Sequence, residues 1–148
     1  MPFILILFIL SLDQLSKLLA TKNLALNDSL PLIKGVFHLT LVHNSGAAFG
    51  IFKDQTFLFI FTSLFAIILI SYKLKFSKNK FPFVYVFSLA LILSGAIGNL
   101  IDRMFFGYVI DFLDFRIWPV FNVADSAITI GAVILGWSIL FRKDKLKS

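Results

Sequence analysis

Four long apolar stretches constrain the fold of this chain more than any other feature. They occupy residues 2–20, 55–72, 81–101 and 123–141. A helix rises 1.5 Å per residue, so about 20 apolar residues cross the hydrocarbon core of a bilayer. Only 15% of the residues are charged, against about 25% in a soluble domain, which excludes a soluble globular protein and a disordered chain. The sequence therefore predicts an all-α membrane protein with one membrane domain, residues 1–148, and four transmembrane helices.

The first stretch has the length of a secretory signal peptide, but its flanks argue against cleavage. No basic segment precedes it beyond the amino terminus, and residues 20–25 offer no clean cleavage site between small residues. We therefore expect residues 2–20 to be retained as a transmembrane helix.

Basic residues indicate how the helices are oriented. The loop 73–80 and the tail 142–148 each carry four Lys or Arg residues. Short segments of this kind stay on the cytoplasmic side of a membrane. The rule places both termini in the cytoplasm and residues 21–54 and 102–122 outside. The formal charge of +6 is thus an orientation signal, and we expect no nucleic-acid partner.

The two outer segments carry signals for structure outside the bilayer. Residues 36–42, V-F-H-L-T-L-V, are rich in β-branched and aromatic residues and predict a strand. A turn of small residues follows at 43–50, so we expect a small β-platform on the outer face of the membrane. The segment 102–122 contains Trp118 and Pro119 among Phe and Ile residues. Because Trp favours the membrane interface, we expect an interfacial segment there.

Several charged residues lie in or beside the apolar stretches, where the bilayer penalises charge. They are Asp13, Lys17, Asp102, Arg103, Asp111, Asp114 and Asp125. By the predicted topology, all except the first two lie near the outer end of a helix. Motifs that are distant in sequence are therefore expected to meet at one outer face.

Two of these groups allow both a structural and a functional interpretation. Asp13 and Lys17 are four residues apart on one helix face, so they either neutralise each other for insertion or form a strut beneath a site. Asp102 and Arg103 either mark the water boundary or supply, through Arg103, a fork of donors for a substrate carbonyl.

Small and amide residues in the third and fourth stretches add three expectations. Gly95 and Gly98 allow another backbone to approach closely, and the deeper Asn99 needs partners for its amide. Asn122 and Asp125 match the first and fourth positions of a capping box, which would also fix the Asp125 carboxylate at the membrane edge.

Asp111 lies in an apolar setting and is hard to explain structurally. Asp125 lies fourteen positions after it, with Pro119 between them, so a chain reversal would bring the two carboxyl groups together. Two carboxyl groups in contact cannot both ionise easily, so one keeps its proton and the other becomes a base. Such a pair activates water against an amide and protonates the leaving nitrogen.

A metal site is not expected from these residues. Asp111 and Asp114 form a single D-x-x-D pair without further carboxylates, and His38 and His43 have no second ligand at metal spacing, so we interpret both His as structural or surface residues. The chain has no Cys, which excludes disulfides, thiolate metal sites and a Cys nucleophile.

Five ordered motifs resemble those of bacterial lipoprotein signal peptidase, also called signal peptidase II. They are D-Q-L-S-K at 13–17, N-S-G-A-A-F-G at 44–50, G-A-I-G-N-L-I-D-R at 95–103, V-I-D-F at 109–112 and F-N-V-A-D-S at 121–126. The resemblance covers essentially the whole chain. It implies an aspartic peptidase of the bacterial inner membrane that removes the signal peptide of diacylglyceryl-modified prolipoproteins, cutting before the lipidated Cys.

The same resemblance implies roles for individual residues. The catalytic dyad maps onto Asp111 and Asp125. The other matched positions comprise residues that bind substrate or support the dyad, Asn44, Gly46, Asn99, Arg103 and Asn122, and structural polar residues, Asp13, Lys17 and Asp102. The resemblance also implies no metal or organic cofactor, and we expect a monomer whose partners are the prolipoprotein and membrane lipids.

Two other classes of protein account for these residues less well. A small proton-coupled transporter would use Asp111 and Asp125 to relay protons, but transporters commonly show internal repeats and none is visible here. A purely structural membrane protein would explain Asn122 and Asp125 as caps, but it leaves Asn99, Arg103 and Asp111 without a reason.

Overall fold

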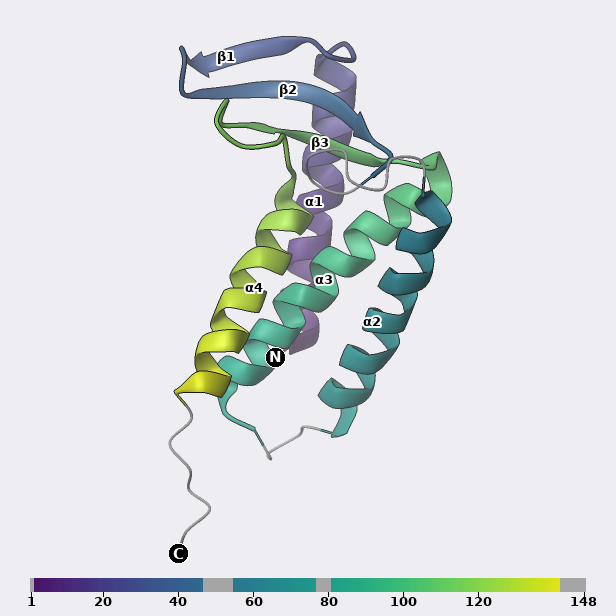
Figure 1. Cartoon of the computed structure of the whole chain (residues 1–148), viewed down its shortest axis with the longest axis vertical. Coiled ribbons are helices and arrows are strands. Elements are labelled where there is room, and N and C mark those ends of the chain that lie inside the picture. Colours follow the sequence, from purple (N-terminus) through teal and green to yellow (C-terminus); the bar gives the residue numbers. More distant parts are fainter. Residues whose placement is uncertain (1, 47–54, 77–80, 142–148) are drawn as a thin grey trace, which may run out of the picture.

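The computed structural model of the chain, which describes residues 2–46, 55–76 and 81–141, is a helical bundle with a small sheet at one end (Figure 1). The helices are α1 (Pro2–Asn23), α2 (Thr56–Phe76), α3 (Phe83–Phe106) and α4 (Val123–Leu140). Each is long and apolar enough to cross a membrane. The predicted four transmembrane helices with an added β-platform are thus confirmed.

Helix α3 is the central helix of the bundle and packs against the other three. Small residues allow this packing. A methyl group added at Gly95 would collide with the carbonyl oxygen of Ala124. The backbones of α3 and α4 therefore approach closely at this glycine, as the sequence predicted. Gly98 has a different reason: a methyl group there would lie 2.6 Å from the Asp13 carboxylate, so this glycine makes room for a charged side chain.

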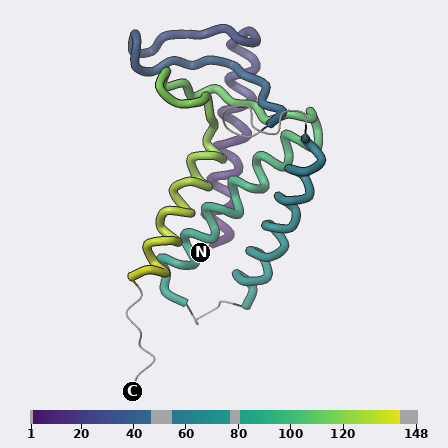
Figure 2. The backbone as a smooth tube through the Cα atoms, viewed as in Figure 1, coloured from purple at the N-terminus to yellow at the C-terminus, as the bar shows by residue number. Residues whose placement is uncertain are grey.

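The outward faces of the helices remain apolar. Phe57 and Phe61 on α2, and Val133 and Trp137 on α4, are more than half exposed. On helices long and apolar enough to cross a membrane, exposed apolar surface of this extent indicates faces that contact lipid. The start of α1 and the end of α4 lie at the end of the bundle opposite the sheet (Figure 2). The predicted loop 73–80 begins within α2, and its residues 77–80, like the tail 142–148, lie outside the described residues.

The sheet is antiparallel with the order β1 (Ser29–Ile33), β2 (Phe37–Asn44) and β3 (Val109–Asp114). The strand predicted at 36–42 is confirmed as β2. One face of the sheet packs on the end of α1, where Ala20 contacts a buried cluster with Leu41, Ile110 and Phe112. The sheet is therefore fixed to the bundle by an apolar core of its own.

The segment 102–122 differs from the single interfacial element that the sequence predicted. Helix α3 continues to Phe106 and ends at Gly107, whose φ of 81° suits the left-handed cap. Residues 109–114 then form β3. Residues 109–112 of this strand are all buried, because β3 packs on both faces. Such a strand lacks a clear alternation of apolar and polar residues, and for this reason the sequence did not predict it.

Candidate active site

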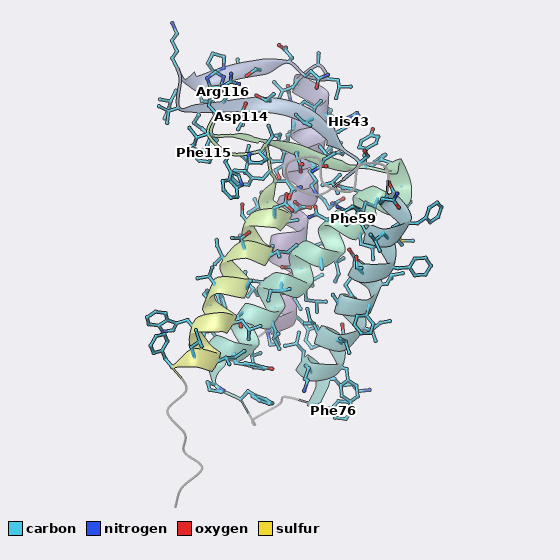
Figure 3. All side chains as sticks on the ribbon, viewed as in Figure 1. His43, Phe59, Phe76, Asp114, Phe115 and Arg116 are labelled. Carbon is cyan, nitrogen blue, oxygen red and sulfur yellow. The ribbon has the colours of Figure 1, made fainter. Side chains whose placement is uncertain are left out.

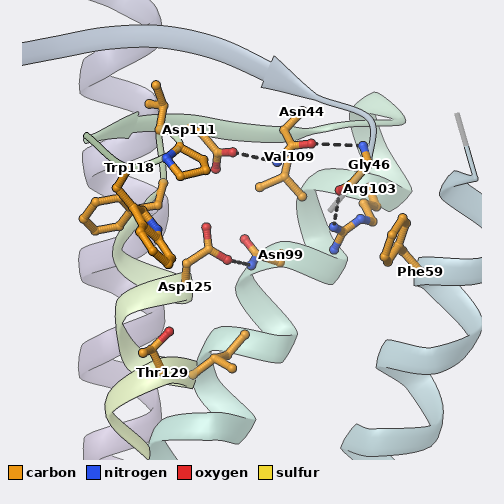
Figure 4. A pocket seen from close by; sticks show the side chains of 14 residues that line it. Asn44, Gly46, Phe59, Asn99, Arg103, Val109, Asp111, Trp118, Asp125 and Thr129 are labelled. Carbon is orange, nitrogen blue, oxygen red and sulfur yellow. Dashed lines mark hydrogen bonds between the residues drawn. The ribbon is translucent and has the colours of Figure 1, made fainter. Parts of the chain in front are cut away.

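Asp111 and Asp125 face one cavity of about 350 Å³ between the sheet, α3 and α4 (Figure 4). Asp111 comes from β3 and is 1% exposed, and Asp125 comes from the first turn of α4. The cavity is also lined by Asn44, Gly46, Phe59, Asn99, Arg103, Val109, Trp118, Pro119, Val120, Phe121, Ile128 and Thr129. The structure therefore brings Asp111 and Asp125 to one cavity, as the sequence predicted.

The capping box at the start of α4 fixes Asp125. The Asn122 side-chain oxygen accepts a hydrogen bond from the Asp125 backbone N–H (2.8 Å). The Asp125 carboxylate in turn accepts from the Asn122 backbone N–H (3.3 Å). The predicted capping box is therefore confirmed. It does not compete with a functional role, since it leaves the carboxylate facing the cavity.

Two asparagine amides hold Asp111. Asn44 Nδ2 donates to one carboxylate oxygen (3.0 Å) and Asn122 Nδ2 donates to the other (2.7 Å). The Asn44 side-chain oxygen accepts from the Gly46 backbone N–H (3.0 Å), which fixes the orientation of its amide. The end of β2 thus positions Asp111.

Asn99 links Asp125 to a buried cation. Its Nδ2 donates to Asp125 (2.8 Å), and its oxygen accepts from Lys17 Nζ (3.1 Å) and from Asn122 Nδ2 (3.1 Å). An amide has one acceptor end and one donor end, so the positive charge of Lys17 at the oxygen turns the donor end toward Asp125.

Lys17 lies in a buried ion cluster with two carboxylates. Its Nζ is 2.9 Å from Asp13 and 2.8 Å from Asp102, and all three side chains are at most 2% exposed. Asp13 also accepts from the Ala124 backbone N–H (2.8 Å), and Asp102 accepts from that of Ile110 (3.1 Å). Lys17 balances one of the two carboxylates, and the cluster also connects α1 to α3, α4 and β3, so these contacts fit both interpretations of the Asp13–Lys17 pair. Asp102 does not mark a water boundary.

Arg103, on α3, lies across the cavity from Asp125 of α4 (Figure 4). Its guanidinium stacks over the Phe59 ring at 4.8 Å, and one of its nitrogens is 3.5 Å from the Gly46 carbonyl oxygen (Figure 4). A planar cation held on an aromatic face keeps donors available for a ligand in the cavity.

Sequence reasoning missed some polar partners of the site. Gln14 Nε2 lies 3.1 Å from an Asp13 oxygen and 3.2 Å from an Asp102 oxygen, so it bridges two acids that Lys17 also binds. The signal was present, since Gln14 is part of the motif at 13–17. Its partner Asp102, however, is 88 residues away in sequence, and periodicity within one helix carries no information about that contact.

The remaining polar candidates have structural partners elsewhere. Asp114 accepts from the Thr40 hydroxyl (2.7 Å) and from Arg116, and these bonds lower its pKa although burial alone would raise it. His38 Nδ1 lies 3.0 Å from the Ser29 hydroxyl, and His43 stacks on Tyr108 with ring centroids 3.9 Å apart. These contacts fit the structural interpretation of both His residues.

The electrostatics of the cavity favour one protonated carboxyl group. Burial raises the pKa of Asp111 to about 7, with repulsion from Asp125 adding to the effect and the bonds from Asn44 and Asn122 opposing it. Near neutral pH, Asp111 is therefore protonated in a large fraction of molecules. The fold and the site together define a class: a membrane protein of four helices with a pair of carboxyl groups at the end that carries the sheet.

Comparisons with known proteins place the chain within this class. The family described as signal peptidase (SPase) II matches residues 5–141. The lipoprotein signal peptidase of Moorella thermoacetica is 50% identical over 141 residues, covering 95% of this chain and 93% of that protein. That of Clostridioides difficile is 42% identical over 147 residues, covering 96% of each. A solved structure described as a bacterial membrane enzyme has a TM-score of 0.90 at 29% identity, covering 99% of this chain and 92% of that one.

The chain belongs to the signal peptidase II family. It is therefore a multi-pass membrane peptidase, as the five motifs indicated. This membership favours a peptidase over the proton-coupled transporter for which the same carboxyl groups would also be suited.

Proposed function

We propose that the chain is an aspartic endopeptidase that removes the signal peptide from diacylglyceryl-modified prolipoproteins, cutting before the lipidated Cys. The observation that carries the proposal is the pair Asp111 and Asp125, which face one cavity and are each held by asparagine amides. The substrate class is supported by the names of the relatives, which are lipoprotein signal peptidases.

The two carboxyl groups divide the chemistry between them. Asp125, at the N-terminus of α4 where a negative charge is favoured, takes a proton from water while the resulting hydroxide adds to the scissile carbonyl carbon. Asp111 gives its proton to the carbonyl oxygen. When the C–N bond breaks, the leaving nitrogen takes the proton from Asp125, and a hydroxyl of the intermediate returns a proton to Asp111. Asn99, Asn122 and Asn44 keep both groups in place.

The rest of the cavity provides contacts for the peptide and its lipid. Arg103, with Gly46 and Phe59 beside it, supplies donors for a substrate carbonyl on one side. Trp118 and Ile128 supply apolar wall on the other side. A cavity with one polar and one apolar side suits a substrate that joins a peptide to acyl chains.

We further propose that the enzyme is a monomer of the bacterial inner membrane, works without a metal or organic cofactor, and has its active site on the outer face. The start of α1 and the end of α4 lie at the end of the bundle opposite the sheet (Figure 1). The basic residues of 73–80 and 142–148 flank that opposite end in sequence, which supports both termini being cytoplasmic.

The experiment that tests the function is cleavage of a prolipoprotein by the purified enzyme in lipid vesicles, followed as a mobility shift on a gel. We expect cleavage of the diacylglyceryl-modified substrate, no cleavage of the same substrate with its Cys replaced by Ser, and equal rates with and without chelator. Cleavage of both substrates at equal rates would refute the substrate class, and loss of cleavage in chelator would refute the aspartic mechanism.

The activity is expected to fall as the pH rises through about 7. The pKa of Asp111 in the folded enzyme is about 7, so above this pH the proton that polarises the carbonyl is lost. Activity also falls at acid pH, when the second carboxyl group is protonated. The kcat/KM of the free enzyme is therefore bell-shaped, and its two apparent pKa values belong to the pair.

A stability measurement separates this titration from effects on the substrate. Because the pKa of Asp111 is raised in the folded state, its contribution to stability is fully present below the unfolded pKa of 3.8 and is lost as the pH rises through about 7. We expect Asp111→Asn to remove this contribution to the pH dependence of Tm. An alkaline limb of kcat/KM well above pH 8 would contradict the assignment.

A further inference from the structure

A short loop beside the cavity has a fixed conformation. Its base is closed by two backbone hydrogen bonds between Leu113 and Phe121, of 2.8 and 3.0 Å. Within it, Asp114 accepts from the Arg116 backbone N–H (2.8 Å) and from its guanidinium (3.1 Å). These bonds hold Arg116 at a φ of 66°, in the left-handed region that costs a non-glycine residue energy. The loop 114–120 is thus held in one shape by its own polar contacts.

This fixed loop leaves two large apolar side chains mostly exposed, and one of them, Trp118, also lines the cavity. Ile117 is 93% exposed and Trp118 is 60% exposed, beside the half-exposed Arg116. Burial would stabilise such side chains by about 25 cal/mol for each Å² of apolar surface removed from water, and leaving them in water loses this free energy. Because the bonds to Asp114 fix the turn, the loop cannot bury Ile117 by folding back on the sheet.

The turn between β1 and β2 lies next to this loop. The Phe37 ring packs against the Phe115 ring with centroids 4.8 Å apart, and Figure 3 shows Phe115 and Arg116 at this end of the sheet. The turn itself exposes Ile33 and Val36 on either side of Lys34. We call the combined surface the tip; its residues are Ile33, Lys34, Val36, Phe115, Arg116, Ile117 and Trp118.

We propose that the tip binds the outer-leaflet interface of the bilayer and prefers anionic lipid. Trp is enriched where headgroups meet acyl chains, and Lys and Arg place an apolar stem in lipid and a charged end among phosphates. In the tip, Lys34 and Arg116 carry positive charges, and the buried Asp114 carboxylate, paired with Arg116 at 3.1 Å, offsets one of them, so these three groups leave a net charge of +1. Charge and apolarity together fit an anionic membrane surface better than they fit another protein.

The position of the tip supports this occupant. The strands run across the ends of the helices, so the tip overhangs the outer end of α4 (Figure 1). The lipid-facing surface of α4, which includes the exposed Ile130 and Val133, continues toward it. Because Trp118 also lines the cavity, binding of the tip to the interface would place the mouth of the cavity at the depth where a diacylglyceryl group lies. That last step rests on the proposed function, whereas the lipid contact itself does not.

Fluorescence can test the depth of the tip, because the chain has two Trp residues. In the Trp137→Phe variant, the emission of the remaining Trp118 is measured in phosphatidylcholine–phosphatidylglycerol vesicles whose acyl chains are brominated either near the headgroup or near the chain end. We expect strong quenching by the shallow bromines and little by the deep ones. The Trp118→Phe variant, which reports Trp137 on the lipid face of α4, is the matched control.

The charge preference is tested with bromine carried by one lipid at a time. Brominated phosphatidylglycerol should quench Trp118 more than brominated phosphatidylcholine at equal mole fraction. Arg116→Gln and Lys34→Gln should each lower this preference by up to about fivefold, the effect of one basic residue at an anionic surface. Arg116→Lys keeps the charge and should retain most of the preference.

Three results would overturn the proposal. The first is full quenching of Trp118 by aqueous iodide with no quenching by brominated lipid. The second is equal quenching of Trp118 by brominated phosphatidylglycerol and brominated phosphatidylcholine in the protein with an unsubstituted tip. The third is protection of Trp118 from iodide that depends on the density of protein in the vesicles and not on lipid bromination. The last would point to a second copy of the chain on the tip. All measurements are made without substrate and can be repeated with Asp111→Asn, so their failure is distinct from failure of the proposed peptidase activity.

Discussion

Replacing Asp125 by Asn is expected to lower turnover of a diacylglyceryl-modified prolipoprotein by at least about 10⁴-fold, the scale seen when a member of a catalytic unit is removed. An amide cannot take a proton from water, so the base of the proposed mechanism is lost. We expect the same result for Asp111→Asn, because the group that protonates the carbonyl oxygen is then missing. The double variant should be no worse than either single one, since the pair acts as a unit.

The folded state of these variants must be separated from their chemistry. Both Asp125 oxygens accept hydrogen bonds, one from Asn99 and one from the Asn122 backbone. Asn at this position keeps one acceptor, so the variant should lose about 1 kcal/mol of stability, the usual cost of a weakened cap. Thermal unfolding in micelles measures this loss. Asp28→Asn, which makes the same charge change at an exposed site, is the control and should keep full turnover.

The assignment of the dyad has a clear contrary result. If either Asp→Asn variant cleaves at more than about a tenth of the normal rate, its carboxyl group is not the acid or base of the reaction, because general acid–base catalysis by one group contributes about 10²–10⁴-fold. If a variant is inactive and also unfolded, Asp125→Glu provides the second measurement. Glu keeps the carboxyl group but moves it by one methylene, so a folded Glu variant should recover part of the turnover.

The transmembrane helices and β2 could be predicted because their signals are local. Each helix has a run of apolar residues that depends on no other part of the chain, and 36–42 has the composition of a strand. The capping box at Asn122 and Asp125 is equally local, since its two bonds join residues three apart. The convergence of Asp111 and Asp125 required one more assumption, a chain reversal before α4.

The features that could not be predicted depend on contacts between distant segments. β1 contains Pro31 and has four exposed residues of five, so no apolar alternation marks it, and it is a strand because β2 pairs with it. Asp102 directly follows the apolar stretch 81–101, as a boundary residue would, and only the structure, with its contact to Lys17, 85 positions earlier, shows that it is buried. In the same way, the two ends of the Asn99 amide are set by Lys17 and Asp125 on different helices.

Replacing Lys17 by Met is expected to destabilise the protein more than any other single change in the polar core. Met has a similar volume, but it leaves Asp13 and Asp102 buried without their cation. Removing one partner of a buried ion pair costs about 3–5 kcal/mol, which corresponds to a drop in Tm of roughly 10 °C for a chain of this size. Thermal unfolding in micelles measures this loss, and Lys22→Met, at an exposed position of the same helix, should change stability by no more than about 0.5 kcal/mol.

A second variant shows whether the loss is electrostatic. Lys17→Met combined with Asp102→Asn restores the net charge of the cluster, because one positive and one negative charge are removed together. Gln14 and the backbone N–H of Ala124 still bind the remaining Asp13. We therefore expect the double variant to be more stable than Lys17→Met alone, although Asp102→Asn alone is destabilising. If the two substitutions instead add, or if Lys17→Met costs no more than Lys22→Met, Lys17 does not balance buried charge, and the orientation of Asn99 toward Asp125 must have another cause.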